Sequence, residues 1–220
     1  MSGAEQDKYY KSGQYDPNPR RSLVGKEIIK FLSPYISLNF TVVDLGAGYC
    51  DFINQVGAAK KYAIDISPEL SKFAGRDVIQ INRQGFNFYE IPNESVDVVF
   101  ASNFLEHFID EELSKIMKEV KRILKKGGKL LLMQPNFRLQ PERYFDDHTH
   151  KKIFTDSSLE SFLLENGFKI ILKMPCFLPQ EMKNSPSFIP HFLMPFLVRL
   201  YLYFPWKPFA GQMLFVAEKL

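Results

Sequence analysis

The chain has 220 residues and a mass of 25.6 kDa. This is about one and a half times the commonest domain size, so we expect one compact domain with short additions. Hydrophobic residues make up 45% and charged residues 24%, which excludes a wholly disordered chain, a collagen-like chain and a coiled coil. The formal net charge is only +3 and no basic stripe accompanies it, so no nucleic acid partner is expected.

Cysteine content and hydropathy bear on the compartment. Cys50 and Cys176 are too few for a disulfide framework or a four-ligand metal site, which favours a reducing compartment. The first 20 residues hold no apolar run typical of a secretory signal. The longest charge-free apolar region, between Lys183 and Arg199, is broken by three prolines and is shorter than the ~20 apolar residues that span a bilayer. We therefore expect a cytoplasmic protein.

Apolar spacing along the chain predicts helices that alternate with strands. Residues 1–20 are polar and rich in turn formers, and they are expected to form a flexible tail or a strap that closes over a ligand. A first helix follows and ends near Pro34. Short β-branched and apolar runs then predict strands at residues 40–45, 60–66, 76–81, 95–102, 129–134, 168–174 and 212–219.

Two further helices are predicted between the later strands. The segment 111–126 places six apolar residues on one face, and Lys-Gly-Gly ends it. The segment 156–166 begins with a capping Asp156 or Ser157 and ends at Gly167. Strands and helices in this alternation predict a doubly wound, Rossmann-like α/β sheet with parallel strands. Ligands of such sheets bind at the carboxyl ends of the strands.

A glycine turn, VVDLGAGYCD, ends the first strand, and we expect it to open a helix. Gly46 and Gly48 lack a Cβ, so a ligand can lie against bare backbone. The dinucleotide fingerprint has a third glycine where Asp51 stands here, and an acid there opposes a pyrophosphate. Asp65 lies 19 residues beyond Gly46, at the distance from which a carboxylate reaches ribose hydroxyls. The pair predicts a nucleoside-like ligand without phosphates, the alternative being an ordinary turn followed by a helix cap.

Five segments, in this order and spacing, resemble the class I S-adenosylmethionine-dependent methyltransferases: DLGAGYCDF, YAIDIS, SVDVVFASNFLEHF, MKEVKRILKKGGKLLLMQPN and DDHTHKKIFTDSSLESFLLENGF. The resemblance covers roughly residues 22–174 and the final strand. It implies a seven-stranded mixed sheet with an antiparallel last strand, and S-adenosylmethionine as the cofactor. We accordingly expect one methyltransferase domain over residues 21–220, with an apolar insertion at about 175–209.

The resemblance implies cofactor contacts at matching positions of the first two strands. Asp44 would hold the methionine amino group. Gly46 and Gly48 would let the backbone pass close to the cofactor. Asp65 would bind the ribose hydroxyls, and Ile66 would pack on the adenine.

Further contacts are implied after the third and fourth strands. Ser102 and Asn103 would lie beside the methionine part and the transferred methyl group. Family members commonly carry an acid after the third strand that touches the adenine amino group. This chain lacks it, and Asn82 or Gln84 is the nearest polar candidate. Cys50 replaces a glycine that is frequent in the family.

Methyl transfer is an in-line displacement, so alignment and water exclusion carry much of the catalysis, and a base is needed when the acceptor holds a proton. Histidine is the usual base near neutral pH. His150, in DHTHKKIFT, matches the family's D-x-T-H-x-x-x-F-T segment and is the first candidate, the alternative being a structural histidine that pins its loop. His107, in FLEHF, is the second, with an architectural role favoured and Glu106 beside it to orient the loop.

No metal site is expected. Asp146, Asp147, His148 and His150 are all ligand types, but residues this close in one loop rarely complete a coordination shell.

The segment from Ser185 to Phe209 is unusually apolar, and its only formal charges are Arg199 and Lys207. One interpretation is a helical insertion whose apolar side covers the core. The other is a patch that contacts a membrane peripherally, with the two cations near headgroups and Trp206 at the interface.

The expected function is methyl transfer from S-adenosylmethionine to a small-molecule or glycan-like acceptor, at oxygen. A sugar or lipid-linked acceptor is preferred, and a quinone or another apolar small molecule comes next. The alternative is a non-catalytic S-adenosylmethionine-binding partner on the same fold. A nicotinamide dehydrogenase is disfavoured by the missing third glycine. The oligomeric state is not predicted.

Overall fold

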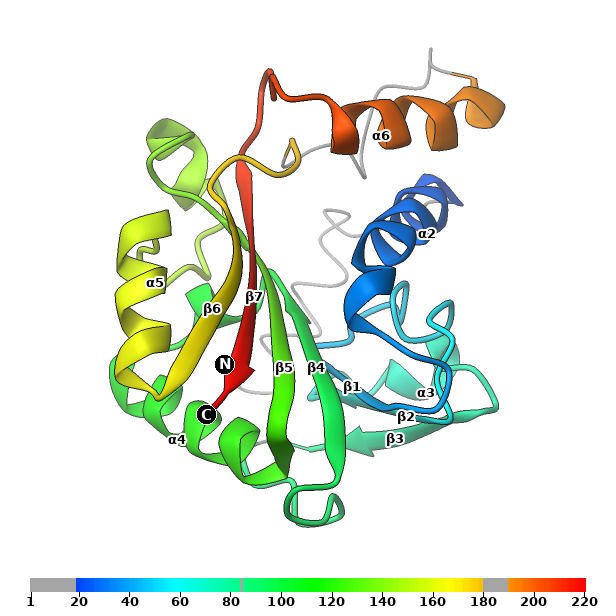
Figure 1. Cartoon of the computed structure of the whole chain (residues 1–220), viewed down its shortest axis with the longest axis vertical. Helices are drawn as coiled ribbons and strands as arrows, with labels where there is room; N and C mark the ends of the chain where they lie inside the picture. The colour runs from blue at the N-terminus through cyan, green and yellow to red at the C-terminus, as the bar shows by residue number, and fades with distance from the viewer. Residues whose placement is uncertain (1–18, 84, 180–189) are drawn as a thin grey trace.

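One seven-stranded sheet forms the centre of the protein (Figure 1). The computed structural model describes residues 19–83, 85–179 and 190–220. The strand order is β3-β2-β1-β4-β5-β7-β6, and β7 alone runs antiparallel to its two neighbours. This confirms the doubly wound mixed sheet with an antiparallel last strand. The strands are β1 (Thr41–Leu45), β2 (Lys60–Asp65), β3 (Val78–Asn82), β4 (Val96–Ser102), β5 (Leu124–Pro135), β6 (Phe168–Met174) and β7 (Gln212–Lys219).

Helices cover both faces of this sheet (Figure 1). One face packs against α4 and α5, and the other against α2 and α6. Residues 1–18 of the expected tail or strap lie outside the described residues. The helices are α2 (Pro19–Leu32), α3 (Leu70–Phe73), α4 (Asp110–Ile123), α5 (Asp156–Glu165) and α6 (Met194–Tyr203), and the 3-10 turns are η1 (Ser33–Tyr35), η2 (Leu105–His107), η3 (Pro141–Asp146) and η5 (His191–Leu193).

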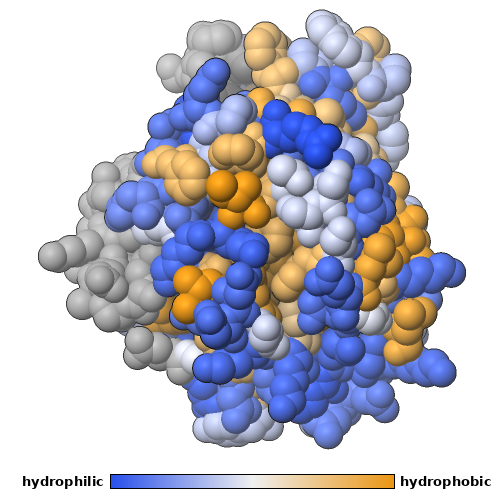
Figure 2. Space-filling view, turned by 90° about the vertical axis from the view of Figure 1, so that its left-hand side faces the viewer, coloured by the Kyte–Doolittle hydropathy of each residue, from blue (hydrophilic) through white to orange (hydrophobic). Residues whose placement is uncertain are grey.

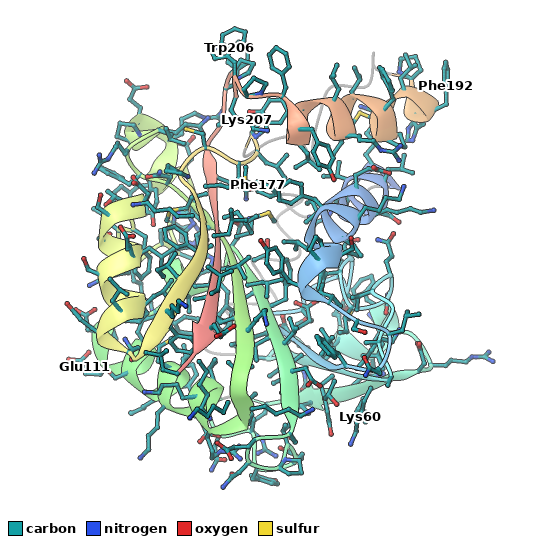
Figure 3. The ribbon with its side chains drawn as sticks, viewed as in Figure 1. Lys60, Glu111, Phe177, Phe192, Trp206 and Lys207 are labelled. Carbon is teal, nitrogen blue, oxygen red and sulfur yellow. The ribbon has the colours of Figure 1, made fainter. Side chains whose placement is uncertain are left out.

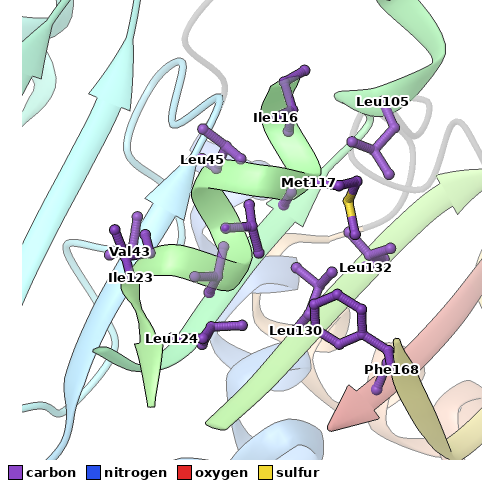
Figure 4. Packing of buried hydrophobic residues seen from close by; sticks show 14 of the residues in the cluster. Val43, Leu45, Leu105, Ile116, Met117, Ile123, Leu124, Leu130, Leu132 and Phe168 are labelled. Atoms are coloured by element: carbon purple, nitrogen blue, oxygen red, sulfur yellow. The ribbon is translucent and has the colours of Figure 1, made fainter. Parts of the chain in front are cut away.

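The apolar face of α4 explains how it docks. Its apolar residues recur at helical spacing and are all buried against β1 and β5 (Figure 4). The helix begins where the Glu112 carboxylate accepts a hydrogen bond from the backbone N–H of Ile109 at 3.1 Å. It ends at Ile123, because Leu124 is extended and already starts β5. The predicted boundary at Lys-Gly-Gly was therefore wrong by a few residues, and those residues form the start of the strand.

The expected helix after β1 is absent. Hydrogen-bonded turns occupy residues 51–55 instead, with isolated bonds such as Asn54 N–H to the Cys50 carbonyl at 3.1 Å. Gly46, Gly48 and Cys50 all have positive φ, which is incompatible with a right-handed helix. The segment between Cys50 and the start of β2 is too short for a stable helix.

The apolar insertion contributes α6, which packs on α2. Met194, Val198 and Leu202 are buried on its inner side. The interpretation as a core-covering helix therefore describes this side correctly. Arg199 crosses to the buried Glu27 of α2, with Nε 3.0 Å from Oε2. This ion pair links two helices that are distant in sequence.

The outer side of α6 is apolar as well. Phe192 and Trp206 lie on the side that faces away from the sheet, at opposite ends of the helix (Figure 3). Lys207 turns inward and donates to the Leu202 carbonyl at 2.7 Å, so it caps the end of α6. Arg199 and Lys207 therefore both have partners within the protein, and the prediction that they lie near headgroups is not supported by these contacts. Among the described residues, none of the helices has the length and hydropathy needed to cross a bilayer.

Candidate functional site

A pocket of about 420 Å³ opens where β1, β2 and β4 end. This is the position at which doubly wound sheets bind ligands, and the volume suits a small molecule. His107 also lines the pocket, whereas His150 lies behind it. All the residues predicted to bind the cofactor line this one pocket: Asp44, Gly46, Gly48, Asp65, Ile66, Ser102 and Asn103.

The glycine turn brings bare backbone to the pocket. Gly46 has φ +75°, and its N–H donates to the Ile64 carbonyl at 2.9 Å. A side chain there would overlap the ring of Phe104. Cys50 has φ +59°, the left-handed conformation that glycine adopts freely, which explains why glycine is frequent at this position. Burial and neighbouring carboxylates raise the pKa of Cys50 to about 12, so its thiol stays protonated.

Replacing Gly46 with alanine is expected to lower the free energy of unfolding by roughly 2–3 kcal/mol and to weaken cofactor binding, because the methyl group adds both left-handed strain and overlap with Phe104. Gly127→Ala is the matched control. Gly127 has the same φ of +75°, but nothing lies within 4 Å of its added Cβ. Chemical denaturation of both variants measures the difference, and equal losses would contradict the role given to the overlap.

Asp65 is held ready at the end of β2. Its Oδ2 accepts from the Gly48 N–H at 2.8 Å, and its Oδ1 accepts from the Ser67 N–H at 2.8 Å. Burial raises the pKa of this carboxyl, while these two backbone hydrogen bonds lower it. Each carboxylate oxygen can accept a second hydrogen bond. The group is therefore able to receive two vicinal hydroxyls without changing its conformation.

Ser102 and Asn103 close the far wall at the end of β4. The Ser102 Oγ atom is buried and has no hydrogen-bond partner among the described residues. Asn103 has φ +50°, and its Oδ1 accepts from Gln212 at 2.8 Å, which ties it to β7. An unsatisfied hydroxyl on a residue that lines a pocket is a candidate contact for a ligand atom. Together with the bare turn and the Asp65 carboxylate, it fits an adenosyl ligand with an amino acid tail.

Sequence reasoning missed part of the pocket wall. Arg21 of α2 lines the pocket and pairs with Asp51, with Nε 2.9 Å from Oδ2. No motif marks Arg21, although Asp51 stood out at the position of the third glycine. The Asn82 side chain donates to the Asp65 carbonyl at 3.2 Å and so stabilises the end of β2. Gln84, the other candidate for the adenine contact, lies outside the described residues.

His107 is oriented by a short relay. Its Nδ1 lies 2.9 Å from the Thr149 hydroxyl oxygen. The Thr149 hydroxyl donates its one hydrogen to Asp147 Oδ1 at 2.5 Å. A hydroxyl that donates to the carboxylate accepts from the imidazole, so the relay favours a proton on Nδ1. Burial lowers the pKa of His107 to about 4, and the ring is neutral near pH 7.

His150 faces away from the pocket into a buried polar cluster. Its Nδ1 lies 2.5 Å from the Tyr144 carbonyl and must donate to it. Its Nε2 lies 3.9 Å from both Glu106 Oε1 and Asp147 Oδ2. Burial lowers the pKa of this histidine as well.

Glu106 holds two loops together and is fully buried. Its carbonyl accepts from the N–H groups of Lys151 and Lys152, at 2.8 and 3.0 Å. Gln134 donates to Glu106 Oε2 and accepts from the Leu105 N–H at 3.1 Å. Glu106 Oε1 has no hydrogen-bond partner among the described residues. Burial raises the pKa of Glu106 to about 8.

Glu106→Gln is expected to change the pH dependence of stability. The folded pKa of Glu106 is about 8, above its ordinary 4.5, so its stabilising contribution is full below pH 4.5 and is lost as the pH rises through 8. With EDTA present, the free energy of unfolding of the wild type should fall by roughly 2 kcal/mol between pH 6 and pH 8 relative to the variant, whose amide stays neutral. Urea unfolding at both pH values measures this. Parallel pH curves would contradict it.

The strand order and the pocket at the carboxyl ends of β1, β2 and β4 define a Rossmann-like domain. A family model described as a methyltransferase domain matches residues 43–132. Residues 43–132 therefore belong to a class I S-adenosylmethionine-dependent methyltransferase domain, whose cosubstrate is S-adenosylmethionine. An uncharacterized protein of Methanocaldococcus jannaschii is 32% identical over 157 residues, which cover 69% of this chain and 65% of that protein.

Solved structures share the fold at low sequence identity. An S-adenosylmethionine-dependent methyltransferase from Archaeoglobus fulgidus matches with a TM-score of 0.67 and 18% identity, over 97% of this chain and 99% of that one. A possible histamine N-methyltransferase from Thermotoga maritima matches with a TM-score of 0.65 and 16% identity, over 99% of this chain and 95% of that one. Geranyl diphosphate C-methyltransferase from Streptomyces coelicolor matches with a TM-score of 0.61 and 14% identity, over 88% of this chain and 80% of that one. The acceptors named for the last two proteins differ, so the fold is compatible with several receiving atoms.

Proposed function

We propose that this protein transfers the methyl group of S-adenosylmethionine to a hydroxyl oxygen of a small-molecule or glycan-like acceptor. The observation that carries the proposal is the composition of the pocket at the ends of β1, β2 and β4. It joins the complete set of predicted cofactor residues to an oriented, neutral His107 and to aromatic side chains. One end therefore suits the donor, and the other suits an acceptor that presents an apolar face and a hydroxyl.

The aromatic end of the pocket supports an acceptor with an apolar face. Phe86, Phe104 and Phe108 line the pocket together, and the ring centres of Phe104 and Phe108 lie 4.7 Å apart. Such rings exclude water and pack on the C–H face of a sugar or on an isoprenoid chain. Exclusion of water favours the in-line displacement, because it protects the aligned donor and acceptor from competing solvent.

His107 is the residue we expect to receive the acceptor proton. It lines the pocket, whereas His150 is separated from the pocket by the His107 ring, with the two ring centres 5.1 Å apart. As the acceptor oxygen bonds to the methyl carbon, its proton must leave, and a neutral imidazole can take it. We assign His150 the role of positioning Glu106 and the loop that carries Thr149. This ordering of the two histidines is part of the proposal.

Turnover with isotopically methyl-labelled S-adenosylmethionine and a fractionated small-molecule extract tests the function. The expected result is a labelled product whose label sits on oxygen, together with S-adenosylhomocysteine. Label found only on nitrogen or carbon would contradict the oxygen assignment. Tight cofactor binding without any turnover would instead support a non-catalytic partner role.

We also propose that the outer face of α6 contacts a membrane interface, which would suit a lipid-linked acceptor. Phe192, Phe196 and Trp206 are 79%, 65% and 70% exposed there. Aromatic side chains of this kind favour the boundary between headgroups and acyl chains. The face on the α5 side is different, because hydrophilic residues surround its apolar patches (Figure 2).

Flotation with anionic liposomes tests the membrane contact. Wild-type protein is expected to float, and the triple serine variant at Phe192, Phe196 and Trp206 should lose most of the floating fraction. Leu164→Ser is the control, because Leu164 is 54% exposed on α5. A wild-type protein that stays with the soluble fraction would refute the contact.

A further inference from the structure

We infer that Glu106, His107 and His150 form a binding site for one divalent transition-metal cation next to the acceptor end of the pocket. One ligand atom from each of the three side chains lies within 4.8 Å of the others. Glu106 and His107 belong to η2 after β4, whereas His150 follows η3 in the loop after β5. The fold thus brings together two distant segments, and this supplies the remote ligands that a single loop lacks.

Glu106 provides the strongest argument for a cation. Its side chain is fully buried, one oxygen accepts from Gln134, and the other has no hydrogen-bond partner among the described residues. A buried carboxyl oxygen left in this state costs about 1–3 kcal/mol unless a ligand satisfies it. The oxygen points toward the His150 ring, whose Nε2 lies 3.9 Å away.

His150 has the orientation of a metal ligand. Its Nδ1 donates to the Tyr144 carbonyl, which leaves the lone pair on Nε2 directed at Glu106 and Asp147. Histidines that bind metals generally donate their other ring nitrogen to a carbonyl or carboxylate in this manner. The 3.9 Å separations are too long for hydrogen bonds, but they leave space between the groups.

His107 is held by Thr149 and backbone groups, so binding would replace one of its present contacts. Ligands at ~2.0–2.2 Å from one ion lie roughly 3.3–3.6 Å apart in a tetrahedral shell. The three groups must therefore close by about 1 Å, a movement that side-chain rotation can supply.

The neighbouring lysines do not supply the positive charge. The Nζ atom of Lys151 lies 3.7 Å from Glu112 Oε2, and the Nζ atom of Lys152 lies 2.6 Å from Asp110 Oδ1. Both lysines therefore pair with acids of α4. Asp147 adds a second carboxylate 3.9 Å from His150. Two imidazoles and a carboxylate suit Mn²⁺, Fe²⁺, Co²⁺ or Zn²⁺, whereas Mg²⁺ and Ca²⁺ prefer a shell of oxygens.

The inferred site adjoins the pocket of the proposed function. His107 belongs both to this site and to the pocket wall, whereas Glu106 is fully buried and His150 does not line the pocket. A cation bound there would lie behind the His107 ring and would fix η2 and the loop after β5 relative to each other.

Metal titration of the tag-free, EDTA-treated protein tests the inference. We expect one Co²⁺ per chain, seen as visible absorption of a nitrogen- and oxygen-ligated ion, and displacement by Zn²⁺ but not by Mg²⁺. Glu106→Gln and His150→Gln should each weaken binding by at least about 10–100-fold. His148→Gln is the control, because His148 lies in the same loop but is exposed and outside the cluster.

The outcomes separate the metal site from the methyltransferase activity. Binding of S-adenosylhomocysteine and circular dichroism show whether each variant is folded. Absence of saturable Co²⁺ binding by the folded wild type would overturn the inference, as would ligand variants that bind Co²⁺ as tightly as the wild type. If labelled product forms at an unchanged rate in EDTA, the proposed function stands with His107 as base and does not depend on the ion. Stoichiometric Co²⁺ binding without turnover supports the site and refutes the activity.

Discussion

Asp65→Ala is expected to reduce the affinity for S-adenosylmethionine by at least about 100-fold. Two losses combine. The ribose hydroxyls lose hydrogen bonds to a charged acceptor, which are worth about 1.5–3 kcal/mol. The Gly48 and Ser67 N–H groups lose the carboxylate that arranges the turn, because Asp65 accepts from both at 2.8 Å.

Isothermal titration with S-adenosylhomocysteine measures this effect. Glu111→Gln is the control, because it also removes one carboxylate but lies exposed at the start of α4 (Figure 3). The control should bind like the wild type. An Asp65→Ala protein that remains folded and binds within threefold of the wild type would contradict the placement of the ribose at β2.

The convergence of Gly46, Gly48 and Asp65 on one pocket could be predicted from sequence because its determinants are local. Gly46 and Gly48 are recognised because glycine lacks a Cβ, and Asp65 is recognised by its separation from Gly46 along the chain. The topology then forces the ends of β1, β2 and β4 to meet, so separate motifs converge on one pocket. The alternation of elements predicted a doubly wound sheet, whereas the antiparallel last strand was implied by the family resemblance.

The helix expected after the glycine turn failed for an equally local reason. Cys50 adopts φ +59°, which a sequence pattern does not reveal for a residue other than glycine. The left-handed conformation thus extends beyond Gly48 and shortens the space for a helix. Tertiary packing of the buried turn residues compensates for the missing helical hydrogen bonds.

The buried cluster could not be predicted because it depends on side-chain contacts between remote segments. FLEHF and DHTHKKIFT were each recognised, but the sequence does not show that Glu106 faces His150 or that Thr149 connects His107 to Asp147. In the sequence, no distant residue obviously completes a coordination shell for the ligand types of the loop that carries His150. The structure supplies Glu106 and His107 from the other side, which changes the number of available ligands.

His107→Gln is expected to lower the turnover number by roughly 100- to 1,000-fold while the affinity for S-adenosylhomocysteine stays within about threefold. Glutamine retains a polar group for the Thr149 hydroxyl but cannot take up a proton or replace the imidazole as a ligand. The loss should therefore fall on the chemical step and leave the donor site intact, because Asp65 and the glycine turn lie on other strands.

Steady-state kinetics and titration calorimetry on the same preparations separate the two quantities. His191→Gln, an exposed histidine on η5, is the control and should keep full turnover. His150→Gln should show a smaller loss than His107→Gln, because His150 acts on the reaction through Glu106 and the loop and does not line the pocket. If His107→Gln turns over normally and His150→Gln does not, the order of the two histidines is reversed. The residue that receives the acceptor proton must then be sought behind the pocket wall.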